Sequence, residues 1–147
     1  MTAGRGIAAL FIWLPMALAA QERCPWLNAA TAAGVLGGEA RMTVTPAACE
    51  FVRQETSGVV SLRIEVTAID APHAHCGSEA ERLKAIGNEA RACTYEGKPN
   101  WIAEQVVGSV RDQAFLVRIA TDDHSAMRKA LREKARNVAE AVAGSLF

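Results

Sequence analysis

Three histidines are the residues of this chain whose type and spacing best suit chemistry. His73 and His75 form a His-x-His pair, and His124 lies further along the chain beside Asp122-Asp123. Imidazole and carboxylate groups together bind zinc or copper(II), so His73, His75 and His124 are candidate metal ligands. A His-x-His pair is nevertheless a weak motif, and exposed loop histidines without a ligand are the commoner interpretation. We therefore expect no cofactor, with Zn or Cu as the alternative.

A second set of candidates is a row of arginines near the C-terminus. Arg128, Arg132 and Arg136 recur at every fourth position, which places them on one face of a helix. Such a row suits contact with an anionic surface, for example a lipid headgroup, a cell-wall polymer or an acidic protein. The alternative, and the commoner case, is a solvated helix face with i,i+4 ion pairs worth a few tenths of a kcal/mol each.

Motifs for catalysis or nucleic-acid binding are missing from the sequence. It has no nucleophile elbow, phosphate-binding glycine loop, CxxC redox pair or CxxCH haem site. Its 16 basic residues balance its 16 acidic ones, whereas general nucleic-acid binding needs a basic footprint. The sequence therefore predicts a non-enzymatic binding or accessory protein that meets an envelope protein or a small ligand. A hydrolase without a recognisable motif is a further hypothesis.

The first 19 residues have the layout of a secretory signal peptide. Arg5 precedes the apolar run Ile7–Leu18, and Ala17-Leu18-Ala19 is a small-x-small cleavage pattern. The run is too short for a transmembrane helix. We expect cleavage after residue 19 or 20 and a periplasmic or secreted chain, 20–147, that forms a single bridged domain without a transmembrane segment.

All four cysteines follow the predicted leader: Cys24, Cys49, Cys76 and Cys93. An even count in an exported chain indicates disulfides, but four cysteines allow three pairings. An internal echo favours one of them, because residues 36–41 (LGGEAR) resemble residues 86–91 (IGNEAR) and 48–51 (ACEF) resemble 92–95 (ACTY).

If this echo reflects an internal duplication, each half closes its own bridge. The pairs would be Cys24–Cys49 and Cys76–Cys93, each worth about 3 kcal/mol in the chain-entropy model. A pseudo-twofold relation between the halves would also bring the two histidine loops together. Chance similarity of short segments is the alternative, and it leaves free thiols or bridges between the halves open.

Hydrophobic periodicity predicts the elements that position these residues. Residues 59–68 alternate apolar and polar positions, which is typical of a strand with one buried face. Val106–Val110 and Ala114–Thr121 read as a hairpin around a polar turn. The next apolar residues follow a helical stripe: Met127, Leu131, Ala135, Val138, Val142 and Leu146. Asp123 or Ser125 is the expected N-cap of this helix.

Shorter elements complete the expected fold. Trp26 to Leu36 has helical spacing and ends at Gly37-Gly38, and Ser78 is expected to cap a short helix that reaches Ala85. Strands are expected near residues 39–45 and 49–53. The predicted fold class is α+β: an antiparallel sheet of five or six strands, with a long C-terminal helix and one or two shorter helices packed mainly on one face.

Several short motifs carry a resemblance to small exported bacterial proteins of unknown function. The motifs are Cys24-Pro25-Trp26-Leu27, Val35-Leu36-Gly37-Gly38, Cys49-Glu50-Phe51, Ile86-Gly87-Asn88-Glu89-Ala90 and Val138-Ala139-Glu140-Ala141-Val142-Ala143-Gly144. The chain is more loosely similar to actinobacterial lipoproteins with a cysteine–helix–Leu-Gly–cysteine opening, although it lacks their lipid-attachment cysteine. The resemblance implies an exported α+β domain and assigns no catalytic residue.

Overall fold

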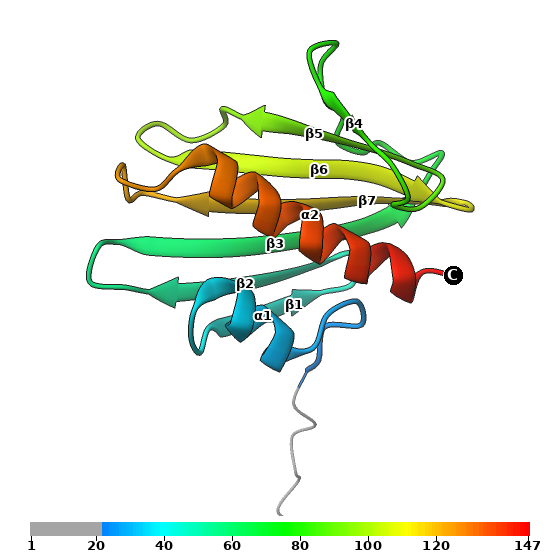
Figure 1. The fold of residues 1–147 in the computed structure, drawn as a ribbon. Helices are drawn as coiled ribbons and strands as arrows, with labels where there is room; N and C mark the ends of the chain where they lie inside the picture. Colours follow the sequence, from blue (N-terminus) through cyan, green and yellow to red (C-terminus); the bar gives the residue numbers. More distant parts are fainter. Residues whose placement is uncertain (1–21) are drawn as a thin grey trace, which may run out of the picture.

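A seven-stranded antiparallel sheet with two helices forms the part of the chain that the structure describes, residues 22–147 (Figure 1). In chain order the elements are α1 (Ala29–Leu36), β1 (Arg41–Thr45), β2 (Ala48–Gln54), β3 (Val59–Ala68), β4 (Glu81–Leu83), β5 (Glu89–Tyr95), β6 (Ile102–Val110), β7 (Gln113–Thr121) and α2 (Arg128–Ser145). The predicted signal peptide lies outside the described residues. Among residues 22–147, no helix is both long and apolar enough to cross a bilayer.

The strands lie in the order β1-β2-β3-β7-β6-β5-β4, and every neighbouring pair is antiparallel. The α+β class and the antiparallel sheet confirm the prediction, but the expected count of five or six strands is too low. The predicted helix between Ser78 and Ala85 is wrong, since this segment forms the edge strand β4. Its backbone pairs with the outer edge of β5, and this pairing prevails over the local capping signal.

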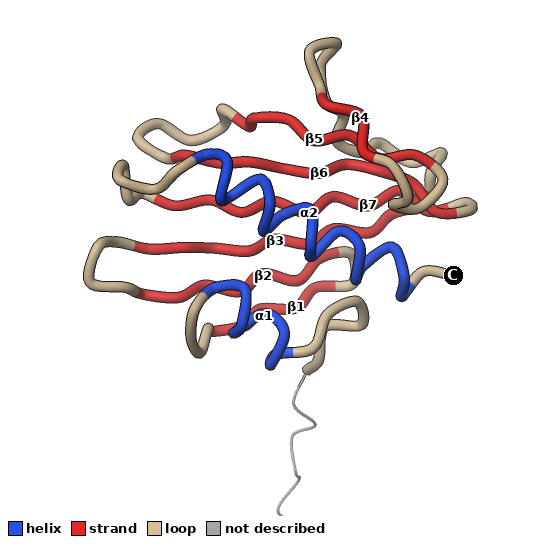
Figure 2. The backbone as a smooth tube through the Cα atoms, in the orientation of Figure 1, coloured by secondary structure: helices blue, strands red, loops and turns tan. Residues whose placement is uncertain are grey.

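Both helices lie on one face of the sheet, as predicted (Figures 1 and 2). The long helix α2 crosses β6 and β7, and the short helix α1 contacts β3. On the sheet side, the core consists of side chains from β3 and β7: Val60, Leu62, Ile64, Val66, Phe115, Val117 and Ile119. From above, α2 buries Leu131, Ala135, Val138, Ala139, Val142 and Ala143 against it.

The two helices begin differently. The side chain of Asn28 accepts a hydrogen bond from the Thr31 amide at 2.8 Å, and α1 ends at Gly37 with φ of 83°, a left-handed conformation that favours glycine. The predicted N-caps of α2 are wrong, because the helix begins at Arg128 without a side-chain cap. Asp123 instead caps the preceding turn. Hydrogen bonds from the hydroxyl and amide of Ser125 hold the pKa of its carboxyl below the ordinary value.

Two disulfides close the loops expected from the sequence echo, Cys24–Cys49 and Cys76–Cys93. They lie on opposite faces of the sheet: Cys49 is fully buried on the helix-covered face, whereas Cys93 points to the other face with its strand neighbours Arg91 and Tyr95. The echoed segments themselves are not in equivalent places, because Glu39-Ala40-Arg41 leads into β1 and Glu89-Ala90-Arg91 begins β5.

Close packing at Gly108 gives a testable stability difference. A Cβ at this position would lie 2.6 Å from Cζ of Phe115 and 2.5 Å from the Glu89 carbonyl oxygen. We expect Gly108→Ala to destabilise the fold by about 1–3 kcal/mol, because a fixed ring and backbone must move. Gly34→Ala is the matched control, since no atom lies within 4 Å of its Cβ; in a helix it should stabilise by up to about 1 kcal/mol. Urea denaturation measures both, and equal effects would contradict this packing.

Candidate functional site

The histidines do not assemble into the predicted metal site. His73 and His75 lie together, with ring centroids 4.5 Å apart, in the loop after β3. His124 follows β7, which runs antiparallel to its neighbour β3. The two strands therefore finish at opposite ends of the sheet, and His124 lies far from the other two histidines. Within residues 22–147, no group of three or more His, Cys, Asp or Glu side chains is placed to hold a metal ion.

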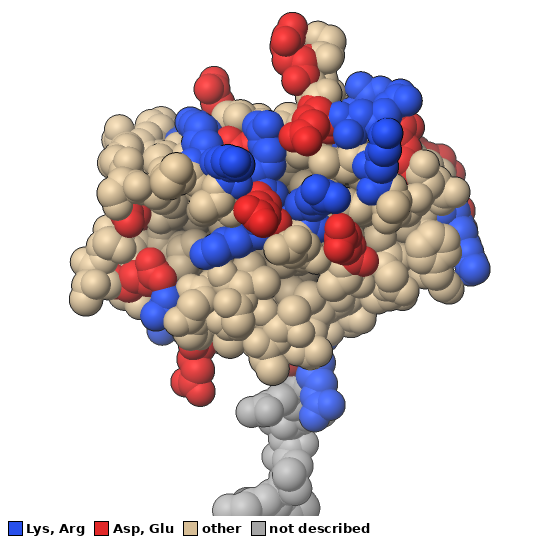
Figure 3. All heavy atoms as spheres, viewed as in Figure 1, with Lys and Arg blue, Asp and Glu red and all other residues tan. Residues whose placement is uncertain are grey.

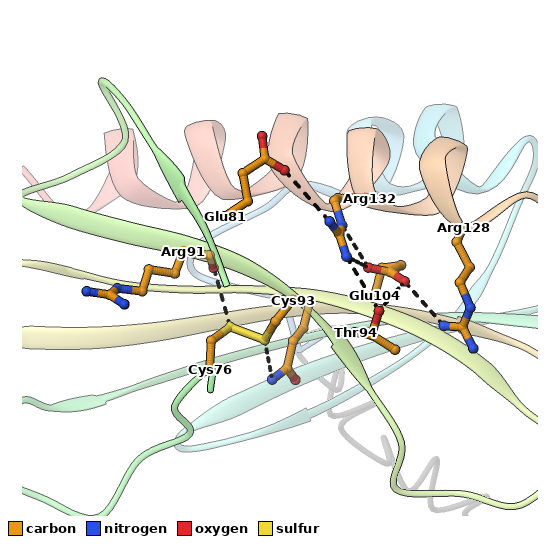
Figure 4. A network of polar contacts seen from close by, with 9 residues as sticks. Cys76, Glu81, Arg91, Cys93, Thr94, Glu104, Arg128 and Arg132 are labelled. Carbon is orange, nitrogen blue, oxygen red and sulfur yellow. Dashed lines mark hydrogen bonds and ion pairs between the residues drawn. A yellow bond between two sulfur atoms is a disulfide. The ribbon is translucent and has the colours of Figure 1, made fainter. Parts of the chain in front are cut away.

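Two of the three predicted contact arginines turn inward to a buried carboxylate on β6, Glu104, which is fully buried beneath α2. Arg132 binds it with Nε and Nη2, both 2.8 Å from Oε2, and Arg128 Nη1 lies 3.2 Å from Oε1 (Figure 4). The Thr94 hydroxyl donates to Oε1 at 2.9 Å. Since a buried charge needs partners, Arg128 and Arg132 are counter-charges of the core.

Arg136, the third arginine, is exposed and pairs with Glu140 at 3.7 Å, one turn further along α2. Charges of both signs alternate over this face of the molecule (Figure 3). The arginine row therefore does not form one free cationic stripe, and most of its charge is matched within the chain.

Among residues 22–147, no helix lies on the opposite face of the sheet, which is only partly covered. The segment 69–77 crosses one half of it and joins β5 through the Cys76–Cys93 disulfide. Beneath this segment Val107 and Leu116 are buried, although both point away from the helices. The other half of the face is left uncovered by the described residues, and a cavity lies there.

This cavity, which we call the open-face trough, has a volume of about 480 Å³. Its floor is formed by Ser61, Ala120 and Ala103, which are direct neighbours across β3, β7 and β6. Tyr95 and Trp101 form one wall. The size is that of a pocket for a small molecule, and the sheet surface is accessible beside this wall at Ser61 and Ala120, which are half-buried, whereas Ala103 is buried.

The end of the trough is formed by a second cross-strand row that contains two arginines. Arg63 and Arg118 face each other across β3 and β7, and Gln105 follows on β6. Arg63 pairs with Glu65 at 2.5 Å and with Glu50 at 3.6 Å. Like charges placed opposite each other destabilise a sheet, so the two facing arginines, Arg63 and Arg118, need negatively charged partners.

Arg118 has an unusual environment. Its Nε and Nη2 donate to the Gln105 side-chain oxygen at 3.0 and 2.8 Å, and its guanidinium carbon stacks 3.5 Å from the centroid of the Tyr95 ring. Burial lowers the pKa of Arg118 below its ordinary value. Among the described residues no carboxylate forms an ion pair with it.

The aromatic wall is held in place by the loop between β5 and β6. Gly97 packs so closely on the Tyr95 phenol that a Cβ at Gly97 would overlap it. The Lys98 ammonium lies over the Trp101 ring, 3.9 Å from its centroid. Tyr95 is therefore fixed between Gly97 and Arg118, and the guanidinium has a defined orientation before any ligand arrives.

The sequence contained one signal for this site that the prediction did not use. Arg118 is the only charged residue of strand β7 and follows its apolar run Ala114–Val117, and a charge in such a strand needs a reason to be there. The trough itself could not be predicted, because it depends on which residues of β3, β6 and β7 lie opposite each other.

Comparisons of this chain with protein-family models, with curated proteins and with solved structures find no match. The resemblance to small exported proteins stays a prediction. The function must therefore be inferred from the geometry of the site.

Proposed function

We propose that this protein is an exported, non-enzymatic binding protein and that the open-face trough is its ligand site. The observation that carries the proposal is Arg118: a half-buried, pre-oriented guanidinium that lines a cavity and forms no ion pair among residues 22–147. Folding leaves this charge partly desolvated without an ion pair, which costs free energy. A ligand that supplies the missing anion would recover that cost.

The two disulfides support the proposed export of the chain. Two disulfides within 126 described residues are compatible with an oxidising, exported environment such as a periplasm. A binding role rather than catalysis is supported by the composition of the trough. Within the part of the chain that the structure describes, its lining includes neither histidine nor cysteine, and the hydroxyls belong to Ser61 and Tyr95.

The site can be tested before its ligand is known. We expect ¹H–¹⁵N spectra of the oxidised chain 20–147, titrated with the small-molecule fraction of an envelope extract, to shift at trough residues. Ala120→Leu fills the floor and should abolish these shifts. Ala30→Leu, the same change at an exposed position of α1, should leave them intact. Shifts confined to the helix-covered face, or shifts that survive Ala120→Leu, would contradict the proposal.

A further inference from the structure

We propose that the ligand of the open-face trough is a small organic acid: one carboxylate, bound by Arg118, on a flat apolar body that lies on the Ser61–Ala120–Ala103 floor. This inference rests on the proposed function and specifies the chemistry of the same site. Three features of the trough support it: the free edge of the guanidinium, the local charge balance, and the shape and polarity of the floor.

The free edge of Arg118 has the geometry of a carboxylate receptor. A guanidinium has five N–H donors in one plane. One from Nε and one from Nη2 are directed at the Gln105 oxygen, so both donors of Nη1 and the second of Nη2 remain. The terminal Nη1–Nη2 edge presents two parallel N–H groups, the arrangement that binds the two oxygens of a carboxylate in a bidentate manner.

Charge balance favours a single negative charge. Two acidic side chains, Glu50 and Glu65, pair with Arg63. Glu65 also acts electrostatically on Arg118 and opposes the lowering of its pKa by burial. Glu50 itself lines the trough. A ligand with several negative charges, such as a polyphosphate, would approach this carboxylate and be repelled. Lys98 is the remaining cation of the lining, but it lies at the exposed loop over Trp101. The three cations Arg63, Lys98 and Arg118 thus exceed the two carboxylates Glu50 and Glu65 by one charge. Arg118, which forms no ion pair among residues 22–147, is the group placed to bind one anion.

The floor and wall favour a flat, apolar body. The floor presents the methyl group of Ala120 and the small hydroxyl of Ser61, with the nearly buried Ala103 beside them, so a planar group can lie directly on the sheet. The rings of Tyr95 and Trp101 stand beside it, and apolar contacts with such rings are a main source of small-molecule affinity. The rigid position of Tyr95 means that little ordering cost is added when the ligand binds.

Isothermal titration with matched probes tests this assignment. We expect 2-naphthoate to bind the oxidised chain at least about tenfold more tightly than 2-naphthamide, which has the same body without the charge. Arg118→Gln should remove this preference, and Arg118→Lys should retain only part of it, because an ammonium keeps the charge but lacks the fork. Arg91→Gln is the control: it removes an arginine of the same face that is paired with Glu89 and lies outside the trough.

Two further measurements separate the possible failures. Equal binding of acid and amide, or unchanged acid binding by Arg118→Gln, overturns the carboxylate assignment; if spectral shifts still map to the trough, the proposed function survives. A short peptide ending in phenylalanine, compared with its C-terminal amide, tests a chain end as the source of the carboxylate. If that peptide acid binds more tightly than 2-naphthoate, the free organic acid is overturned as the ligand and a peptide terminus replaces it.

Discussion

Replacing Arg132 by methionine should destabilise the protein by about 3 kcal/mol. The substitution keeps the length of the side chain but removes the guanidinium that binds Glu104 with two donors. A carboxylate buried under α2 then loses its main partner, and breaking a buried pair by removing one member costs about 3–5 kcal/mol. The lower end applies because Arg128 and Thr94 still contact the carboxylate. Urea denaturation of the oxidised chain measures the loss.

Arg136→Met is the matched control for this experiment. It makes the same chemical change one turn further along the same helix, where the ion pair with Glu140 is exposed. Its cost should be under about 0.5 kcal/mol. The double variant Glu104→Leu with Arg132→Met should recover to within about 1 kcal/mol of the wild type, because no unpaired buried charge remains. Equal losses for Arg132→Met and Arg136→Met would show that Glu104 does not depend on its buried partner.

Opening the Cys24–Cys49 bridge should have the second large effect. This disulfide closes 25 residues, against 17 for Cys76–Cys93. The chain-entropy model gives about 3–4 kcal/mol for loops of this size. The Cys24→Ala, Cys49→Ala variant should lose more stability than Cys76→Ala, Cys93→Ala, because Cys49 is fully buried and its removal also leaves a small cavity.

The two double cysteine variants should show the opposite order when ligand binding to the open-face trough is measured: the Cys76→Ala, Cys93→Ala variant should lose more affinity. Cys93 receives a 3.5 Å contact from the Gln105 amide nitrogen, and the other end of that amide accepts both hydrogen bonds from Arg118. Loss of Cys76–Cys93 therefore affects the trough, whereas loss of Cys24–Cys49 acts only on the helix-covered face.

The stability prediction has its own contradiction. An equal loss of stability for the two double variants would contradict the difference in burial.

Period-two and period-3.6 patterns predicted the long elements well. The alternation in β3 expresses one buried face, and the apolar run of β7 expresses a strand whose first half is buried on both faces. The helix α2 carries an apolar stripe that packs on this sheet. Such elements are encoded locally, since every turn or pleat repeats the same preference. Gly37 likewise marks the end of α1, because its left-handed backbone is a property of a single residue.

Features that depend on distant segments could not be predicted. The strand β4 exists because Glu81–Leu83 pair with β5, and its own residues suggested a helix cap. Glu104 reads as a polar residue near a strand end, yet the register of β6 against β7 places it on the core side opposite Ile119. The same applies to the Arg63–Arg118 row, which arises from pairing between strands about 50 residues apart.

The tapered outline of the sheet has a consequence for the behaviour of the protein in concentrated solution. The two outermost strands, β1 and β4, have five and three residues, whereas the inner strand β3 has ten. An uncapped row of amides and carbonyls recruits strands from other molecules, and short borders limit that templating. The longest hydrogen-bonding ladders are enclosed between neighbours, so the chain offers little backbone at its perimeter from which a fibril could start.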